Sequence, residues 1–299
     1  MRFGPLAVPS EPFLLLTTPR VRPAAADVVH VPPGRVDEIS AALLAEHSFP
    51  PDLLLVAHGG GRVIDTAKAI AGAVGGRCAA IPTTLSGAEM TGFHRTPAGV
   101  SGARLVRPAL VLADPELMAS APMPGLAASA MNALAHALEA LYTPLANPVT
   151  TMAALRAASL LAAGISADPP DREALALGAV LAGYASGSTG IAIHHAICQT
   201  LVRETGTPHA ETNAVMLPHS ARFMEPRAPE ALAAFRDALD SHSLPGLAAL
   251  SGHTTLSALG VSEQQLTRVA GLVTEHPLVA NTPQPPGEAE LLQLLREAL

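Results

Sequence analysis

The sequence predicts an α/β domain followed by an all-α domain. Over residues 1–119, short apolar runs alternate with segments of helical periodicity, which is the pattern of a parallel sheet with crossover helices. After residue 119 the strand signals disappear, and apolar residues recur at i, i+3 and i+4 between Pro and Gly residues. We therefore expect an α/β domain over 1–119 and a helical domain over 120–299.

The elements of the first domain follow one another in a regular order. The predicted strands are FLLLTT (13–18), DVVHV (27–31), LLLVAH (53–58), CAAIPTT (78–84) and LVLADPEL (110–117), the last ending in a turn. The predicted helices are RVDEISAALLAEH (35–47) and RVIDTAKAIAGAV (62–74). Only about eight residues separate the first two strands, whereas a parallel crossover normally needs a dozen or more. We therefore expect the first crossover to be truncated.

The second domain begins with two long amphipathic segments, MPGLAASAMNALAHALEALY and NPVTTMAALRAASLLAAGI. Residues 174–193 then carry no charge over about the length of a membrane span. Their many Gly, Ser and Thr residues favour a buried core helix over a transmembrane one. A Pro-rich stretch over 281–290 precedes a last helix.

Composition narrows the class of function. The net charge is −7 and the basic residues do not cluster, so nucleic acid and anionic membranes are not expected partners. The two cysteines, Cys78 and Cys198, show no metal-ligand spacing, which is typical of a reduced, cytoplasmic protein. A small-molecule substrate is the remaining expectation.

A glycine-rich turn is the first candidate site. Three glycines stand between a buried strand and a helix, where they let the backbone approach a phosphate and where the helix N-terminus favours an anion. Hydroxyls follow the next strand, at the end where open α/β sheets bind ligands. The candidate cofactor-binding residues are Gly59, Gly60, Gly61, Arg62, Thr83, Thr84 and Ser86. A tight strand-to-helix turn would also explain the glycines.

Histidines form the second candidate site. Asn132 and His136 are four residues apart in a predicted helix and share one face, while His195 and His209 lie on either side of a helix-sized segment. Together they could surround a divalent ion or an anionic substrate, although a single histidine is more often structural. His194 is expected to pack against or orient its neighbours.

Five motifs in order resemble the iron-containing alcohol dehydrogenase superfamily: AHGGGRVIDTAKAIA, IPTTLSGAEMT, ADPEL, MNALAHALEALY and HHAICQTL followed by TPHAETNAVMLPH. NALAHALEALY, the HH doublet before Cys198 and PHAETNAVMLPH are more similar to its maleylacetate reductase branch. The resemblance spans roughly residues 50–220. It implies a dinucleotide-binding α/β domain, a helical domain, an active site in the cleft between them, and assembly as a homodimer or larger oligomer.

The resemblance also implies roles for the candidate residues. NAD(P)H would bind at the glycine turn, and the family's metal ligands, an Asp and three His, fall on Asn132, His136, His195 and His209. An amide is a poorer ligand than a carboxylate for a hard cation, so we do not expect a tightly held iron or zinc ion. If a metal binds, its ligands would be His136, His195 and His209.

Two further positions depart from the family pattern. Gln199 replaces the usual His four residues after His195 and cannot move a proton near neutral pH. Arg62 replaces the Ser that usually follows the glycines, where it could clamp a pyrophosphate or obstruct one.

The function implied by the resemblance is NAD(P)H-dependent reduction of a small carbonyl or unsaturated keto-acid such as maleylacetate. His195 and its neighbours would polarise the substrate oxygen or deliver a proton, and His136 and His209 would bind its carboxylate or carbonyl. The alternative is a repurposed member with lyase, isomerase or cyclase activity at the histidines. A catalytically silent scaffold is a third possibility.

Overall fold

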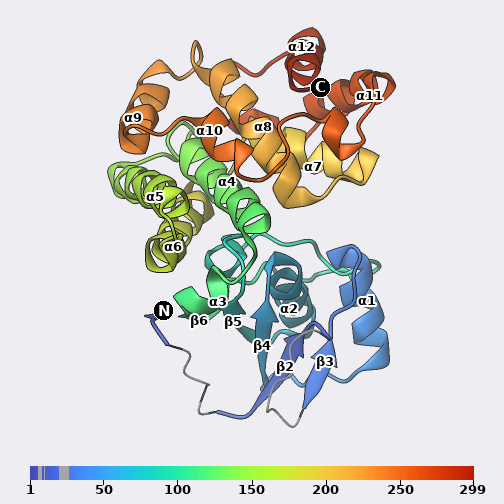
Figure 1. Ribbon diagram of the computed structural model, residues 1–299. Coiled ribbons are helices and arrows are strands. Elements are labelled where there is room, and N and C mark those ends of the chain that lie inside the picture. The colour runs from blue at the N-terminus through green and yellow to red at the C-terminus, as the bar shows by residue number, and fades with distance from the viewer. Residues whose placement is uncertain (6–8, 10, 20–26) are drawn as a thin grey trace. The chain divides into compact units, whose positions relative to one another are not determined.

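The computed structural model describes residues 1–5, 9, 11–19 and 27–299. The chain forms two compact units, Met1–Ser120 and Ala121–Leu299 (Figure 1). The first holds the described strands and the second is built from helices, so the predicted fold class is confirmed.

Unit 1 contains a six-stranded sheet in the order β1-β6-β5-β4-β2-β3, with every neighbouring pair parallel. The strands are β1 (Arg2–Phe3), β2 (Phe13–Thr17), β3 (Val28–His30), β4 (Leu54–Gly59), β5 (Arg77–Pro82) and β6 (Leu110–Ala113). Five match predicted strands, and β1 was not predicted. The residues DPEL after β6, expected to form a turn, instead begin the short helix α3 (Pro115–Met118), because Asp114 caps it through the Glu116 N–H.

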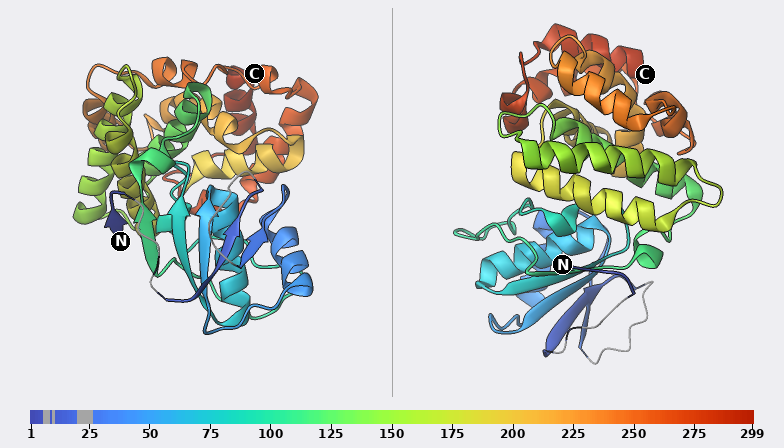
Figure 2. Two further views of the ribbon diagram at one scale, coloured as in Figure 1. Left: turned by 60° about the horizontal axis from the view of Figure 1, so that its bottom comes forward. Right: turned by 90° about the vertical axis from the view of Figure 1, so that its left-hand side faces the viewer.

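Both faces of this sheet are apolar, and alternate residues of each strand serve opposite faces. Leu16, Leu55 and Ala80 pack with α1 (Val36–Glu46) and α2 (Gly61–Val74), which Figure 2 shows beside the sheet. Leu15, Val56 and Ile81 form a smaller cluster on the other face with Leu117 of α3. The continuous apolar runs in the sequence follow from this two-sided burial.

The register of the central strands positions the glycine turn. Gly59 at the end of β4 lies opposite Pro82 at the end of β5, and the Thr83 N–H donates to the Gly59 carbonyl at 3.1 Å. The segment that follows β5, which contains the short 3-10 helix η1 (Ala88–Met90), therefore begins beside the start of α2.

β2 and β3 are parallel neighbours, with Leu15 opposite Val28. The truncated crossover predicted between them falls on residues 20–26, which lie outside the described residues.

The regular elements of unit 2 are all helices. Its helices are α4 (Met123–Glu139), α5 (Pro148–Ser166), α6 (Arg172–Thr189), α7 (Ile193–Thr205), α8 (His209–Met224), α9 (Pro229–Leu239), α10 (Leu244–Ala249), η2 (Ser257–Leu259), α11 (Glu263–Thr274), η3 (Pro277–Asn281) and α12 (Glu288–Ala298). α5 and α6 pack so closely that a Cβ added at Gly178 would lie 2.8 Å from the Leu161 Cγ.

The sequence led us to expect one helix over the uncharged segment 174–193, but the structure breaks this segment into two helices. α6 ends at Thr189, Gly190 adopts a φ of 84°, and α7 begins at Ile193 in a direction bent by 100°. A positive φ cannot continue a right-handed helix, and glycine adopts it without steric cost. Of the described helices, α5 alone has the length and composition of a membrane span, with 44% of that window buried, and a core helix has the same properties.

Candidate active site

Three polar side chains lie among the buried apolar residues of α4. Asn132, His136 and Glu139 follow at intervals of four and three residues, so they lie along one side of the helix. Their relative exposures are 4%, 9% and 0%. Buried polar groups are stable only with partners, so their surroundings define the site.

The Glu139 carboxylate accepts hydrogen bonds from the first turn of α7. Its Oε1 receives the His194 N–H at 2.7 Å and the His195 N–H at 3.3 Å, and its Oε2 receives the Ala192 N–H at 2.9 Å. The N-cap of α7 is Ala192, which has no capping side chain, so Glu139 satisfies N–H groups that the helix itself leaves free.

The same carboxylate orients His195. The Nδ1 of His195 lies 2.6 Å from Glu139 Oε2, while its Nε2 is buried without a hydrogen-bond partner among the described residues. The His195 ring stacks on the His136 ring, with centroids 4.3 Å apart and planes at 24°. His136 Nδ1 is likewise buried without such a partner.

These buried rings are neutral at ordinary pH. Burial, aided by the nearby His209, lowers the pKa of His195 to about 3, and burial also holds the pKa of His136 well below its usual value. Burial raises the pKa of Glu139, but neighbouring histidines and backbone N–H groups oppose that rise. The three backbone N–H groups that donate to Glu139 favour its ionised form, which places the hydrogen of the His195 contact on Nδ1 and leaves a lone pair on Nε2.

His194 lies next to His195, and both of its ring nitrogens have hydrogen-bond partners. Its Nδ1 lies 2.7 Å from Ser220 Oγ and its Nε2 2.9 Å from Asn213 Oδ1. The Asn213 amide in turn donates to the His209 carbonyl at 2.7 Å, at the start of α8. His209 itself is exposed. The structure thus places His136 and His195 together in the core of unit 2, with His194 in a supporting network that reaches the exposed His209.

The side chains at the implied ligand positions differ from a carboxylate-containing metal site. Among the described residues, no group of three or more His, Cys, Asp and Glu side chains could hold an ion. Zinc lies about 2.0–2.1 Å from each ligating nitrogen along the plane of the ring. The fourth position implied for a ligand, Asn132, supplies a neutral amide in place of a carboxylate. The residues present therefore do not fit the carboxylate-containing ligand set of a tightly held ion.

The glycine turn of unit 1 fits a phosphate group. The N-cap of α2, Gly60, has no side-chain hydrogen bond, and the first turn carries no acidic residue. A Cβ at Gly60 would lie 3.0 Å from the Thr84 side chain, whose hydroxyl is buried without a hydrogen-bond partner among the described residues. Arg62 in the first turn of α2 adds positive charge. This combination favours an anion at the helix start.

Three residues of the histidine network were not predicted from the sequence: Glu139, Asn213 and Ser220. Glu139 could have been found, because it is the only charged residue in α4 and is flanked by Leu138 and Ala140. A charge inside an apolar helix signals a buried, paired group. No comparable signal marks the other two.

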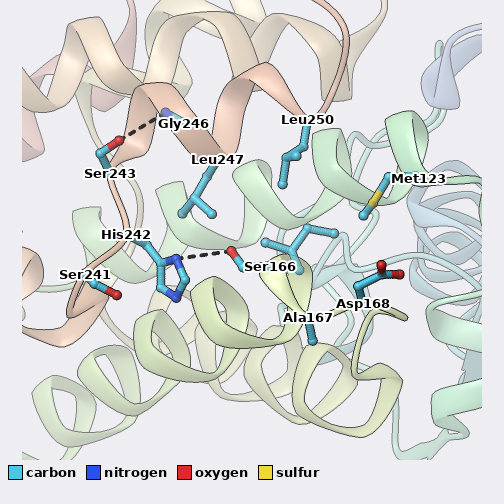
Figure 3. Close-up of a pocket in the computed structure, with 11 residues that line it drawn as sticks. Met123, Ser166, Ala167, Asp168, Ser241, His242, Ser243, Gly246, Leu247 and Leu250 are labelled. Atoms are coloured by element: carbon cyan, nitrogen blue, oxygen red, sulfur yellow. Dashed lines mark hydrogen bonds between the residues drawn. The ribbon is translucent and has the colours of Figure 1, made fainter.

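A surface pocket of about 380 Å³ lies elsewhere in unit 2 (Figure 3). It is lined by α10, the end of α5 and the adjacent loops, and it contains an exposed contact of 3.2 Å between Ser166 Oγ and His242 Nδ1. None of the predicted site residues lines it.

The comparisons with known proteins agree with the motifs. The sequence model "Fe-containing alcohol dehydrogenase family, C-terminal" matches residues 126–299. Maleylacetate reductase 1 of Rhodococcus opacus is 39% identical over 80% of this chain and 71% of its own length. The maleylacetate reductase of Sphingobium indicum is 33% identical over 91% of this chain and 80% of its own.

Solved structures give the same result. The maleylacetate reductase of Agrobacterium tumefaciens aligns with a TM-score of 0.79 at 31% identity, covering 96% of this chain and 89% of its own. An iron-containing alcohol dehydrogenase from Thermotoga maritima aligns with a TM-score of 0.82 at 20% identity, covering 97% of this chain and 92% of its own, and so shares the fold. The chain therefore belongs to the iron-containing alcohol dehydrogenase family, in its maleylacetate reductase branch.

Proposed function

We propose that this protein is an NAD(P)H-dependent reductase of maleylacetate or a closely related unsaturated keto-acid. The single observation that carries the proposal is the buried His136–His195 pair held by Glu139, in a chain 39% identical to a maleylacetate reductase. A lyase, isomerase or cyclase is not favoured, because the relatives that match over most of the chain are named as reductases.

The cofactor, when bound, supplies the hydride. In this proposal Gly59, Gly60 and Gly61 accommodate its pyrophosphate at the start of α2, and Arg62 and Thr84 donate hydrogen bonds to it. Support comes from the uncapped helix start and the unpartnered Thr84 hydroxyl. Thr83 and Ser86 lie on the same segment and complete the proposed cofactor site.

The substrate is assigned to the histidines of unit 2. The neutral His195 does not release a proton at neutral pH, but its Nε2 can accept a hydrogen bond from a water molecule and so orient that water to donate to the substrate oxygen. His209, which is exposed, is the histidine suited to pair with a substrate carboxylate, and the proton that completes the reduction comes from His209 or water. Asn132 and His136 form the adjoining wall, where they orient the substrate.

Metal, location and assembly complete the proposal. The reaction proceeds without a tightly held ion, since a neutral amide stands at Asn132 where metal-dependent members have an aspartate. The protein acts in the cytoplasm as a homodimer, as we expect from its reduced cysteines and from the family resemblance.

The test is turnover by the purified protein. We expect maleylacetate to be reduced with consumption of NADH or NADPH, and His195→Asn to lower kcat by about 100-fold because it removes the acceptor Nε2. His30→Asn, at an exposed residue of β3, is the matched control and should match the wild type. Absence of reduction with both cofactors at saturating substrate would contradict the proposal.

A further inference from the structure

We propose that Glu139 is a positioning residue that fixes the tautomer of His195, so that Nδ1 carries the proton and Nε2 keeps a lone pair that accepts from the water molecule beside the substrate oxygen. This inference rests on the proposed function for its catalytic meaning. The tautomer itself can be tested without substrate.

The argument begins with the hydrogen-bond inventory around the carboxylate. Oε2 receives the Ala192 N–H at 2.9 Å and faces His195 Nδ1 at 2.6 Å. Oε1 receives the His194 and His195 N–H groups, with the Tyr142 hydroxyl at 3.4 Å. A backbone N–H can only donate, so both oxygens must accept.

The tautomer follows from this inventory. Three backbone N–H groups donate to this carboxyl group and stabilise its ionised form, and a carboxylate has no proton to donate, so the hydrogen of this short contact belongs to Nδ1. In a neutral imidazole the second nitrogen then carries the lone pair. That nitrogen, Nε2, is the atom that the described residues leave without a partner.

Glu139 also ties α4 to the N-terminus of α7, so its two roles must be separated. A glutamine at this position keeps the size of the side chain and one accepting oxygen. The position of Oε1 faces two backbone N–H donors and the position of Oε2 faces one. The glutamine oxygen should therefore take the Oε1 position, and the NH₂ group the Oε2 position. In that position the amide N–H would donate to His195 Nδ1, so that the ring proton would lie on Nε2.

The experiment is long-range ¹H–¹⁵N NMR of protein labelled at its histidines, with His195 assigned by its loss in His195→Asn. We expect a protonated Nδ1 and an unprotonated Nε2 in the wild type, and the reverse in Glu139→Gln. Glu297→Gln is the control, because Glu297 pairs with Arg222 at the surface and should leave the His195 signals unchanged. A protonated Nε2 in the wild type, or the same tautomer in Glu139→Gln, would overturn the inference.

A kinetic measurement connects the tautomer to the reaction. Glu139→Gln should lower kcat by about 100-fold and leave the dissociation constant of NADH unchanged, whereas general loss of structure would weaken both. If Glu139→Gln does not fold, the wild-type spectrum still decides the question. If the wild type does not reduce maleylacetate, the proposed function is wrong. The tautomer of His195 is tested separately, by the NMR spectrum alone.

Discussion

At the scale of single residues, Asn132 separates this chain from the metal-binding pattern of its family. It stands one helical turn before His136, where the resemblance implies an aspartate in metal-dependent members. An aspartate would supply a charged oxygen ligand next to two neutral imidazoles, whereas the amide supplies only a dipole.

We therefore expect Asn132→Asp to bind Zn²⁺ or Fe²⁺ at least about tenfold more tightly than the wild type. Calorimetric titration and elemental analysis of both proteins would measure this difference. Chelator treatment should leave wild-type activity unchanged, and loss of activity that Fe²⁺ or Zn²⁺ restores would contradict a metal-independent reaction.

Glu89 gives a second prediction at this scale. It is fully buried, its carboxyl oxygens have no hydrogen-bond partner among the described residues, and burial raises its pKa to about 7. Between its ordinary value of 4.5 and about 7, the folded protein holds a proton that the unfolded chain releases. The contribution of Glu89 to stability is therefore present below pH 4.5 and is lost as the pH rises toward 7.

Glu89→Gln removes this titration while keeping the shape of the side chain. Its free energy of unfolding should rise relative to the wild type between pH 5 and 8, with a total change on the order of 3 kcal/mol. Urea denaturation across this range measures the difference. A difference that is independent of pH would show that Glu89 ionises normally in the folded protein.

The sequence predicted the histidines and Asn132 of the candidate site but not their hydrogen-bond partners, and the reason is physical. The spacing of Asn132 and His136 follows from the helical repeat, because α4 is continuous. The partners of Glu139 lie 53 to 56 residues further along the chain and are mostly backbone N–H groups, which carry no sequence signal. Buried networks that use main-chain donors need the tertiary structure to be seen.

At the scale of elements, α2 connects the glycine turn to the core of unit 1. Lys68 in this helix is fully buried and donates to the Ala88 and Phe93 carbonyls at 3.0 and 2.6 Å and to Asp65 at 2.8 Å. It therefore anchors the segment after β5 against the helix. This anchor explains why a lysine stands among the buried residues of α2.

Gly72 sets how closely α2 approaches the chain near residue 104. A Cβ at this position would lie 2.2 Å from the Arg104 carbonyl oxygen, a backbone atom that cannot move aside alone. Gly72→Ala should lower the free energy of unfolding by about 1–3 kcal/mol, despite the better helix propensity of alanine.

The control for this substitution is Gly92→Ala, where an added Cβ would meet nothing within 4 Å. We expect it to change stability by less than about 0.5 kcal/mol in the same urea titration. Equal stability of the two variants would mean that the contact at Arg104 relaxes without cost.

Element types were easier to predict than element ends. The strands β2 to β6 and the helices α1 and α2 follow from periodicity, whereas the break between α6 and α7 was missed. Periodicity does not reveal that break, because the residues on both sides of Gly190 are uncharged. What allows α7 to begin there is the Glu139 carboxylate from α4, which is a tertiary contact.

At the scale of the whole molecule, the two units carry different parts of the proposed chemistry. Unit 1 offers an uncapped helix start and a cation in an acidic protein, and unit 2 offers neutral imidazoles in an apolar core. A reductase needs both an anion-binding turn for its cofactor and a site that orients its substrate. The sequence predicted this division because each motif lies within one unit.

The central claim is that hydride passes from a nicotinamide to maleylacetate on this protein. The most direct measurement uses NADH or NADPH deuterated on the reactive carbon, with each face of the ring labelled in a separate sample, followed by mass spectrometry of the product. We predict that one labelled sample transfers its deuterium to carbon in the product, in step with oxidation of the cofactor. An unlabelled product from both samples, or no oxidation of either cofactor, would contradict the account.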